Sequence, residues 1–259
     1  MPVTLEIEVS REGHVALIEI CRPPHNYFTI KLIREIGDAL KALDEDKDIR
    51  AVVLAARGSS FCAGADLKDN GDFGGADVSG RFGALYDVGA ELLRTKKPII
   101  AAMQGAAVGG GVGLALVADF RVASPSSRFT VNFVKLGIHP GFGLTVTLPR
   151  VVGGQKAAEL FLTGKRIGGE EALAIGLIDR LVPEEELRAA AFALANEITV
   201  NAPLAIISIR ETLRLGLYEA ATERMERERS EQVRLRVTTD AEEGIRAVTE
   251  RRDGRFIGG

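Results

Sequence analysis

The sequence predicts an α/β fold with a mainly parallel sheet, followed by a helical C-terminal part. Short apolar runs typical of buried strands alternate with longer segments whose apolar residues recur at helical spacing, and this alternation favours strand–helix–strand units. From Pro183 onward helical patterns dominate, with breaks at Asn201–Pro203 and at Gly216. We therefore divide the chain into a core over residues 1–200 and a C-terminal helical region over residues 201–259.

The first elements each have a local signal. Val3–Val9 and His14–Ile20 are apolar runs on either side of Ser10–Gly13, which predicts a hairpin of two strands. Thr29 is the expected N-cap of a helix whose apolar residues repeat up to the charged stop at Asp44–Asp48.

The later elements follow the same alternation. Strands are expected at Ala51–Ala55, Ile99–Met103 and Phe120–Ala123, and helices near Arg81–Arg94, from Gly110, near Gly143–Val152 and near Gln155–Leu162. Asn70–Gly80 is too rich in glycine and aspartate for a regular element. We expect it to be a mobile loop that borders the site, the alternative being a plain surface insertion.

Composition narrows the class of protein. The chain has 259 residues, of which 46% are hydrophobic and 27% charged, which is ordinary for a globular protein. A net charge of −3 provides no general field for nucleic acid or an anionic membrane, so neither is an expected partner. Two cysteines and three histidines without paired spacing predict no metal site. They also favour a reducing, cytoplasmic location.

One uncharged segment resembles a membrane span in length. Ile99–Ala118 carries no charge over 20 residues, about the ~20 that cross a bilayer. The five glycines within it favour a buried strand, a tight turn and a buried helix instead.

Two glycine-bearing segments are the most informative features of the chain. Phe61–Lys68 and Gln104–Leu114 each follow a strand-like run and lead into a helix-like segment. Both therefore place backbone N–H groups at a helix entrance, where negative charge is stabilised. Two such groups that converge on one substrate oxygen would form an oxyanion hole. The alternatives are glycine required only for packing, or a dinucleotide-binding turn, which lacks its third glycine here.

These segments resemble the two oxyanion motifs of the enoyl-CoA hydratase/isomerase, or crotonase, superfamily. The family forms are (A/C)-A-G-A-D-(I/L)-K and N-G-x-x-x-G-G-G-x-E-L-A, which correspond here to Cys62–Lys68 and Gln104–Ala115. The resemblance also includes Arg22–Pro23, Leu148–Gly153, Leu162–Gly164 and Ala241–Ile245. It implies a spiral of ββα units with a C-terminal helical trimerisation region, an acyl-CoA thioester as substrate, and a homotrimer or hexamer.

The resemblance also implies a set of site residues. The backbone N–H groups of Ala65 and Gly110 would hold the thioester oxygen while an enolate forms. Contacts with the substrate and its CoA part are implied for Ala63, Ala65, Asp66, Leu67, Lys68, Gly110, Arg22, Arg210 and Phe256. Arg22 lies in a turn one residue shorter than the family's. Arg210 and Phe256 match positions that often reach CoA across a subunit boundary, the alternatives being a surface arginine and a packing phenylalanine. CoA enters as part of the substrate, and no separate cofactor is implied.

The chain departs from the family at its acid–base positions. Hydratases of the family have a glutamate shortly after the glycine triple and a second about twenty residues on, where this chain has Gly113 and Phe133. An aspartate position used by some isomerases and dehalogenases of the family is Gly141 here. General acid–base catalysis needs an ionisable group within reach.

Other ionisable groups are then considered for this role. His139 is the candidate, because histidine is the commonest general acid or base, the alternative being a histidine held by the backbone. Loop carboxylates could also enter the site, namely Asp69, Asp72 and Asp77. Cys62 occupies a small-residue position and is not expected to be a nucleophile.

The sequence thus predicts an acyl-CoA-processing enzyme of the lyase/isomerase class that stabilises a thioester enolate, with inefficient hydration. Three alternatives stay open. These are decarboxylation of a malonyl-type acyl-CoA, hydrolysis of a carbon–carbon bond, and a non-catalytic acyl-CoA binding protein.

Overall fold

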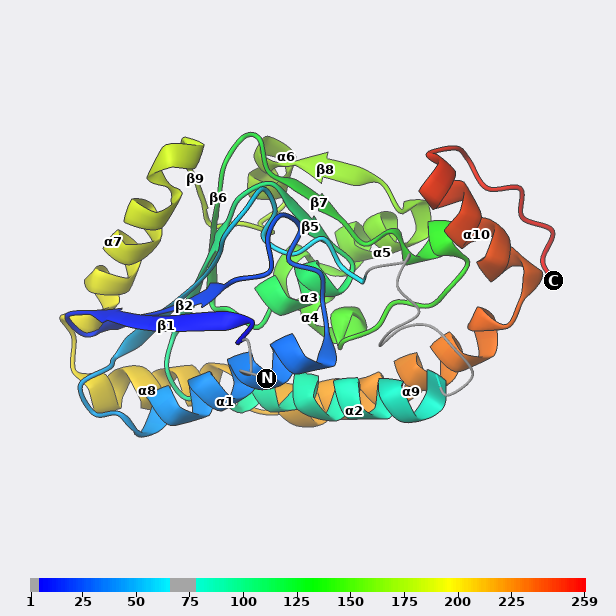
Figure 1. Ribbon diagram of the computed structural model, residues 1–259. Helices are drawn as coiled ribbons and strands as arrows, with labels where there is room; N and C mark the ends of the chain where they lie inside the picture. The colour runs from blue at the N-terminus through cyan, green and yellow to red at the C-terminus, as the bar shows by residue number, and fades with distance from the viewer. Residues whose placement is uncertain (1–4, 66–77) are drawn as a thin grey trace.

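The main sheet has six strands and is mostly parallel. The computed structural model describes residues 5–65 and 78–259, with side chains from residue 85 onward in the second range. The strand order is β1-β2-β3-β4-β6-β9, with β1 antiparallel to β2 and the other neighbours parallel. Their bounds are β1 Ile7–Glu12, β2 Val15–Ile20, β3 Ala51–Ala56, β4 Ile99–Met103, β6 Phe120–Ala123 and β9 Arg180–Leu181 (Figure 1). The predicted α/β class with a mainly parallel sheet is confirmed.

A second sheet joins segments that the sequence analysis did not identify as strands. It has the order β5-β7-β8, with β5 at Ala106–Val108, β7 at Arg128–Thr130 and β8 at Arg166–Gly168. Three residues are too few for a periodic apolar signal, which explains why the sequence did not reveal these strands. Cys62 forms an isolated parallel bridge with Ala107, so this sheet connects the two glycine motifs.

Helices cover the sheet and complete the core. The first seven are α1 Ile30–Glu45, α2 Val78–Glu91, α3 Gly110–Ala115, α4 Leu144–Val152, α5 Gly154–Thr163, α6 Gly169–Ala174 and α7 Leu187–Thr199. Short 3-10 turns occur at η1 Leu92–Arg94, η2 Asn132–Leu136 and η3 Glu184–Glu186. Thr29 is the N-cap of α1, because its hydroxyl accepts the Leu32 N–H at 3.0 Å.

Two boundaries differ from the sequence predictions. Strand β1 continues through Ser10–Glu12, and the turn falls at Gly13, whose φ of +56° is the left-handed conformation that glycine adopts readily. Helix α2 begins at Val78, inside the predicted loop Asn70–Gly80. The rest of that predicted loop lies outside the described residues.

Side chains pack against both faces of the main sheet. Side chains of β3 alternate, so that Val53 packs toward α7 and Val52 toward the larger cluster that includes α1. All six β3 residues are buried, as expected of a parallel strand covered on both faces.

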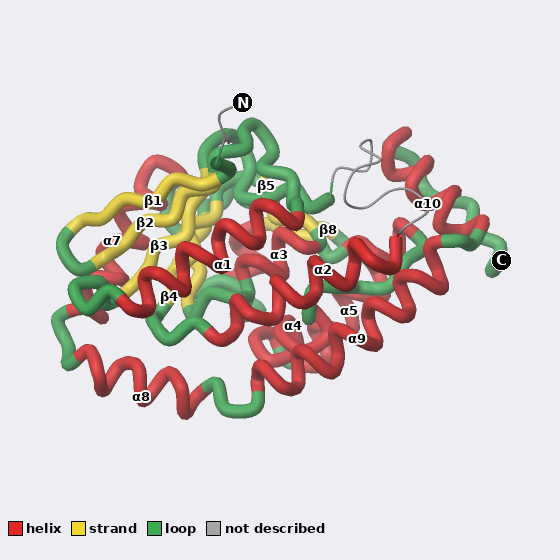
Figure 2. The backbone as a smooth tube through the Cα atoms, turned by 60° about the horizontal axis from the view of Figure 1, so that its bottom comes forward, coloured by secondary structure: helices red, strands yellow, loops and turns green. Residues whose placement is uncertain are grey.

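The C-terminal helices are α8 Pro203–Leu213, α9 Leu217–Arg236 and α10 Thr239–Glu250. Helix α9 runs beside α2, and α10 packs near η2 (Figure 2). The charged run Glu223–Glu231 on α9 is only partly solvated, since Met225 and Glu228 are buried. The division of the chain at residue 200 stays a prediction.

Among the described residues, no single helix is both long and apolar enough to span a bilayer. The segments Glu184–Thr199 and Pro203–Leu213 meet the criteria of length and composition only as a pair, across a bend of 105°.

Candidate functional site

Backbone hydrogen bonds join the two glycine motifs directly. The Val108 N–H donates to the Cys62 carbonyl at 3.0 Å, and the Cys62 N–H donates to the Ala106 carbonyl at 3.1 Å. One step earlier, the Phe61 N–H donates to the Gln104 carbonyl at 2.9 Å. Segments about forty residues apart in the chain therefore lie side by side.

Two glycines permit this close approach. A Cβ atom at Gly111 would lie 2.1 Å from the Cys62 carbonyl oxygen, and one at Gly64 would lie 2.7 Å from the Val108 carbonyl oxygen. Gly64 also has a φ of +79°, which side chains other than glycine rarely adopt. Glycine is thus needed at positions 64 and 111 for the two motifs to pack against each other.

Both predicted oxyanion donors line one cavity. Ala63, Ala65 and Gly110 contribute to the wall of a cavity of about 740 Å³, within the ~300–1,000 Å³ usual for ligand pockets. Gly110 is the first residue of α3, so its N–H has no partner within the helix. Among the described residues, neither the Ala65 nor the Gly110 N–H donates to a protein acceptor.

Aromatic rings form the wall beside these N–H groups. The Phe28 ring lies 3.4 Å from the place of a Cβ atom at Gly110, and the Phe133 ring lies 3.3 Å from that at Gly109. Phe28 also meets Phe142 edge to face, with 4.8 Å between ring centroids. The part of the cavity next to the donors is therefore apolar.

Phe142 fills the space beside Gly113. A Cβ atom at Gly113 would lie 2.8 Å from the Phe142 ring, and one at Gly89 would lie 2.3 Å from the same ring. Phe142 is buried and has a φ of +61°, which is uncommon for a bulky residue. A glutamate at position 113 would therefore require Phe142 to move.

The polar lining of the cavity comes from other residues. Its described members with polar or charged side chains are His25, Tyr27, Ser60, Tyr86, Asn132, Arg166, Gln232, Arg236, Thr249 and Arg251. None of the described lining residues is aspartate or glutamate. Burial raises the pKa of the Tyr86 hydroxyl well above its usual range, so this group stays protonated. Burial also lowers the pKa of Arg236.

Sequence reasoning missed Tyr86, Gln232 and Arg236. The spacing of Gln232 and Arg236, four residues apart on α9, places them on one helix face. This spacing could have revealed the two residues, but the charged residues of both signs around them predicted an exposed helix face instead.

His139 does not line the cavity. Its Nδ1 atom lies 2.7 Å from the Pro140 carbonyl oxygen, and its own carbonyl accepts the Gln232 amide at 2.8 Å. The structure thus favours the histidine held by the backbone over the acid–base role predicted for it.

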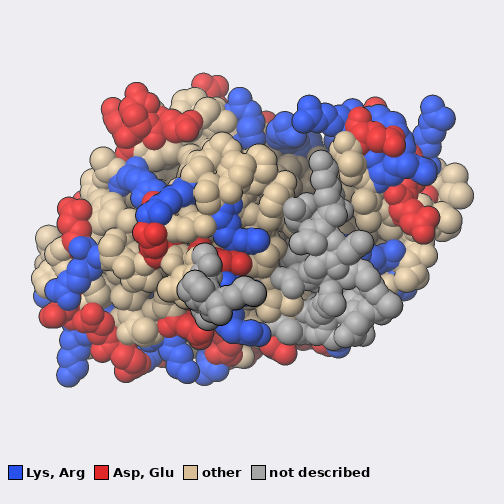
Figure 3. Space-filling view, in the orientation of Figure 1, with Lys and Arg blue, Asp and Glu red and all other residues tan. Residues whose placement is uncertain are grey.

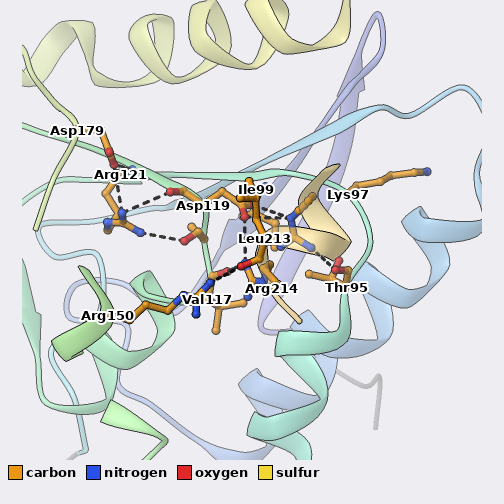
Figure 4. A network of polar contacts seen from close by, with 12 residues as sticks. Thr95, Lys97, Ile99, Val117, Asp119, Arg121, Arg150, Asp179, Leu213 and Arg214 are labelled. Carbon is orange, nitrogen blue, oxygen red and sulfur yellow. Dashed lines mark hydrogen bonds and ion pairs between the residues drawn. The ribbon is translucent and has the colours of Figure 1, made fainter. Parts of the chain in front are cut away.

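Arg210 lies in a buried ionic network away from the cavity. Its Nε atom donates to Asp119 at 2.8 Å, and its Nη1 atom donates to the Thr95 carbonyl. Arg214 also pairs with Asp119, at 3.0 Å, and further residues extend this network (Figure 4). A CoA contact from Arg210 is therefore not supported within one subunit, because this guanidinium holds α8 against the sheet.

The remaining predicted contacts lie elsewhere or outside the described residues. Arg22 donates to the Tyr27 carbonyl at 2.5 Å and pairs with Glu6 at 3.4 Å, and it does not line the cavity. Phe256 is 45% exposed and also lies outside the cavity lining. The predicted residues outside the described ranges are Asp66, Leu67, Lys68, Asp69, Asp72 and Asp77.

Two further groups are a buried cysteine and a cluster of possible metal ligands. Burial raises the pKa of the Cys62 thiol to about 12, which agrees with its exclusion as a nucleophile. Glu8, Glu19 and Cys21 lie close enough together to be considered as metal ligands. Arg57 forms ion pairs with both carboxylates, and Arg188 also pairs with Glu19, so two arginines already balance the two negative charges.

Comparison with known proteins agrees with this geometry. The family model for enoyl-CoA hydratase/isomerase matches residues 10–259. A probable enoyl-CoA hydratase of Rhizobium meliloti is 35% identical over 250 residues, which cover 96% of each chain. A short-chain-enoyl-CoA hydratase of Clostridium acetobutylicum is 37% identical over 213 residues, which cover 81% of each chain.

Solved structures share the fold. A carnitinyl-CoA hydratase of Mycobacterium avium has a TM-score of 0.85 and 34% identity, with 99% of this chain and 100% of that chain covered. An enoyl-CoA hydratase/isomerase of Pseudoalteromonas atlantica has a TM-score of 0.86 and 28% identity, with 97% and 100% covered. The α/β fold with helices at its C-terminus is that of the crotonase class, as expected. The chain belongs to the enoyl-CoA hydratase/isomerase family, and it is an acyl-CoA-processing enzyme of that family.

Proposed function

We propose that the cavity binds an acyl-CoA thioester and stabilises its enolate through the N–H groups of Ala65 and Gly110. One observation supports this most strongly: Ala65 and Gly110 line the same cavity, and neither N–H group has a described protein acceptor. A thioester oxygen that gains negative charge is the acceptor that such donors stabilise. The apolar rings of Phe28, Phe133 and Phe142 exclude water beside it, and this strengthens the interaction.

The experiment removes one donor. Ala65→Pro deletes the N–H group, and we expect turnover to fall by about 10²–10³. The matched control is Glu170→Pro, which introduces proline in the exposed first turn of α6. Turnover and binding of a saturated acyl-CoA are measured for both variants, and circular dichroism verifies folding. A folded Ala65→Pro protein with wild-type turnover contradicts the assignment.

The second candidate reaction is decarboxylation of a malonyl-type acyl-CoA. None of the described cavity-lining residues carries a carboxylate. Repulsion of the substrate's carboxylate is therefore absent from these residues, which favours this reaction. The bond between Cα and the carboxylate carbon breaks, CO₂ leaves, and the electron pair enters the enolate at the two N–H groups. A proton from solvent then restores Cα, so the protein needs no glutamate pair.

We further propose that the chain assembles as a homotrimer or hexamer. The support is an apolar surface around α8, whose exposed residues are Val200, Leu204, Ile209, Leu213 and Leu215. Several exposed apolar side chains on one segment are typical of a protein interface.

A further inference from the structure

The cavity has a charged, exposed mouth and a buried, apolar inner end. Arg166 and Arg251 line it and are exposed. On the face seen in Figure 3, lysine and arginine side chains gather over β8 and α10, the elements next to these two arginines. Leu85 and Phe142 line the same cavity but are buried. The mouth thus suits the charged CoA part of a thioester, and the inner end suits its acyl group.

The Phe142 ring fills the gap between two helices at the inner end. A Cβ atom at Gly89 in α2 would lie 2.3 Å from this ring, and one at Gly113 in α3 would lie 2.8 Å from it. Glycine inside a helix is less stable than alanine. The space that the ring occupies is therefore a physical reason for glycine at both positions.

The ring also lies close to a proposed oxyanion donor. Phe142 meets Phe28 edge to face, and the Phe28 ring lies 3.4 Å from the place of a Cβ atom at Gly110. Gly113 follows Gly110 by three residues on α3, a rise of about 4.5 Å. An acyl group that starts at Gly110 and extends along α3 therefore meets the Phe142 ring after a few carbon atoms.

Hydrogen bonds from two helices hold the backbone at this ring. The Tyr86 hydroxyl on α2 is hydrogen-bonded to the backbone of Phe142. The next residue, Gly143, donates its N–H to the buried carboxylate of Glu228 on α9 at 2.7 Å. Because α2 and α9 pack against each other, both attachments belong to one rigid unit.

A third attachment and the backbone conformation add to this restraint. The Gln232 amide donates to the His139 carbonyl at 2.8 Å, and a Cβ atom at Gly141 would lie only 2.7 Å from that amide nitrogen. Phe142 has a φ of +61°, a conformation that a bulky residue keeps only where its surroundings determine it. The ring is therefore fixed in the pocket rather than free to swing aside.

We propose that Phe142 is a specificity-determining residue that limits the length of the acyl chain, so that the preferred substrates are CoA thioesters of short acyl groups. This rests on the proposed function, since the thioester oxygen must lie at Ala65 and Gly110. Each methylene that the apolar wall buries increases affinity about fourfold. Beyond the ring, further carbons stay in water or must displace a packed side chain, so the gain ends there.

The test measures binding of saturated thioesters by calorimetry, which requires no turnover. Acetyl-, butyryl-, hexanoyl-, octanoyl- and decanoyl-CoA form the series, and free CoA gives the contribution of the CoA part. For the wild type we expect affinity to rise about fourfold per methylene over the first members. It should then stop rising or fall.

Variants assign this limit to the ring. In Phe142→Ala the rise should continue to longer chains, so that octanoyl-CoA binds about tenfold tighter than to wild type or more, while free CoA binds as before. Phe142→Leu keeps an apolar side chain and should extend the limit by less. It provides the test if circular dichroism shows that Phe142→Ala does not fold. The matched control is Phe192→Ala, which removes a partly buried ring on α7, outside the cavity lining.

The outcomes separate this limit from the proposed catalysis. Wild-type affinity that keeps rising to decanoyl-CoA overturns the proposal, as does a length profile that the folded Phe142 variants leave unchanged or that Phe192→Ala changes equally. A limit that moves with Phe142 in a protein without turnover supports the proposal and contradicts the catalytic one. No binding of any thioester by the folded protein overturns both.

Discussion

At the scale of single residues, small side chains and one aromatic ring determine the chemistry. By the resemblance of the motifs, Gly113 and Phe133 correspond to the family's two glutamates. The ring of Phe142 lies where a side chain at position 113 would extend. A side chain at position 113 would meet this ring, so a single substitution is not expected to introduce an acid–base group there.

We accordingly expect hydration of crotonyl-CoA to be absent or several orders of magnitude below that of a hydratase with both glutamates. General acid–base groups contribute about 10²–10⁴ each, and neither Gly113 nor Phe133 can transfer a proton. The measurement is the loss of the conjugated enoyl thioester absorbance, with decarboxylation of malonyl-CoA followed in parallel. Hydration at rates typical of the family would contradict this expectation.

Restoring hydration requires space for the new glutamate side chains as well as their charge. Gly113→Glu with Phe133→Glu should stay inactive, because Phe142 lies 2.8 Å from the place of the new Cβ atom. Adding Phe142→Ala removes the ring, and we expect measurable hydration only in this triple variant. Equal hydration in the double and triple variants would show that Phe142 is not the obstacle.

At the scale of elements, α9 connects the C-terminal helices to the site. Its inward stripe Glu228, Gln232 and Arg236 first caps α4, then holds the segment at His139, then lines the cavity. Because these residues repeat every four positions, one helix face performs all three tasks.

The cap on α4 predicts a pH dependence of stability. Burial, the largest effect, raises the pKa of Glu228 above its ordinary range. The folded state therefore binds this proton more tightly than the unfolded state does, and the stabilisation by the protonated form is lost as pH rises through the raised pKa. We expect wild type to lose unfolding free energy relative to Glu228→Gln as pH rises above the ordinary carboxyl range.

The control for this experiment has the opposite sign. A hydrogen bond from Arg234 lowers the pKa of Glu231 on the same helix. The stabilisation by this hydrogen bond is therefore present above the pKa that Glu231 has in the unfolded chain, and it is lost as pH falls. Urea titrations at several pH values measure the unfolding free energy of Glu228→Gln and of the control Glu231→Gln. A Glu228→Gln difference that is independent of pH would show that the carboxylate is ionised equally in both states.

At the scale of the whole molecule, the exposed apolar surface of α8 is the feature that a single chain leaves unexplained. Ile209 is 60% exposed and Leu213, one turn further on, is 67% exposed, while Arg210 on the same helix anchors it to Asp119. The helix is thus held firmly to the core with an apolar face toward solvent, as an assembly surface requires.

We expect the wild type to be a trimer or hexamer by light scattering at micromolar concentration. Ile209→Glu with Leu213→Glu should shift it toward monomer, because charges at an apolar interface are costly to desolvate. Leu162→Glu, which changes an equally exposed leucine on α5, is the control and should leave the mass unchanged. A wild-type monomer would refute the assembly.

Much of the fold was predictable from local patterns, and part of the site was not. Strands β4 and β6 agree with the sequence prediction residue for residue, and Thr29 is the N-cap that was predicted. Strands β5, β7 and β8 were missed because each has only three residues. The hydrogen bond between Arg210 and Asp119 was not predicted, because the two residues lie about ninety positions apart in the chain.

The sequence by itself determined the α/β class, the family, the two glycine motifs and the absence of glutamates at positions 113 and 133. These are properties of residues close together in the chain, where spacing and residue type suffice. Only the tertiary structure decided that Phe142 fills the space beside Gly113, that the His139 ring lies against the Pro140 carbonyl, and that Tyr86 and Gln232, from two helices, both approach Gly141. Such contacts join segments distant in sequence, and packing in three dimensions selects them without any local periodic signal.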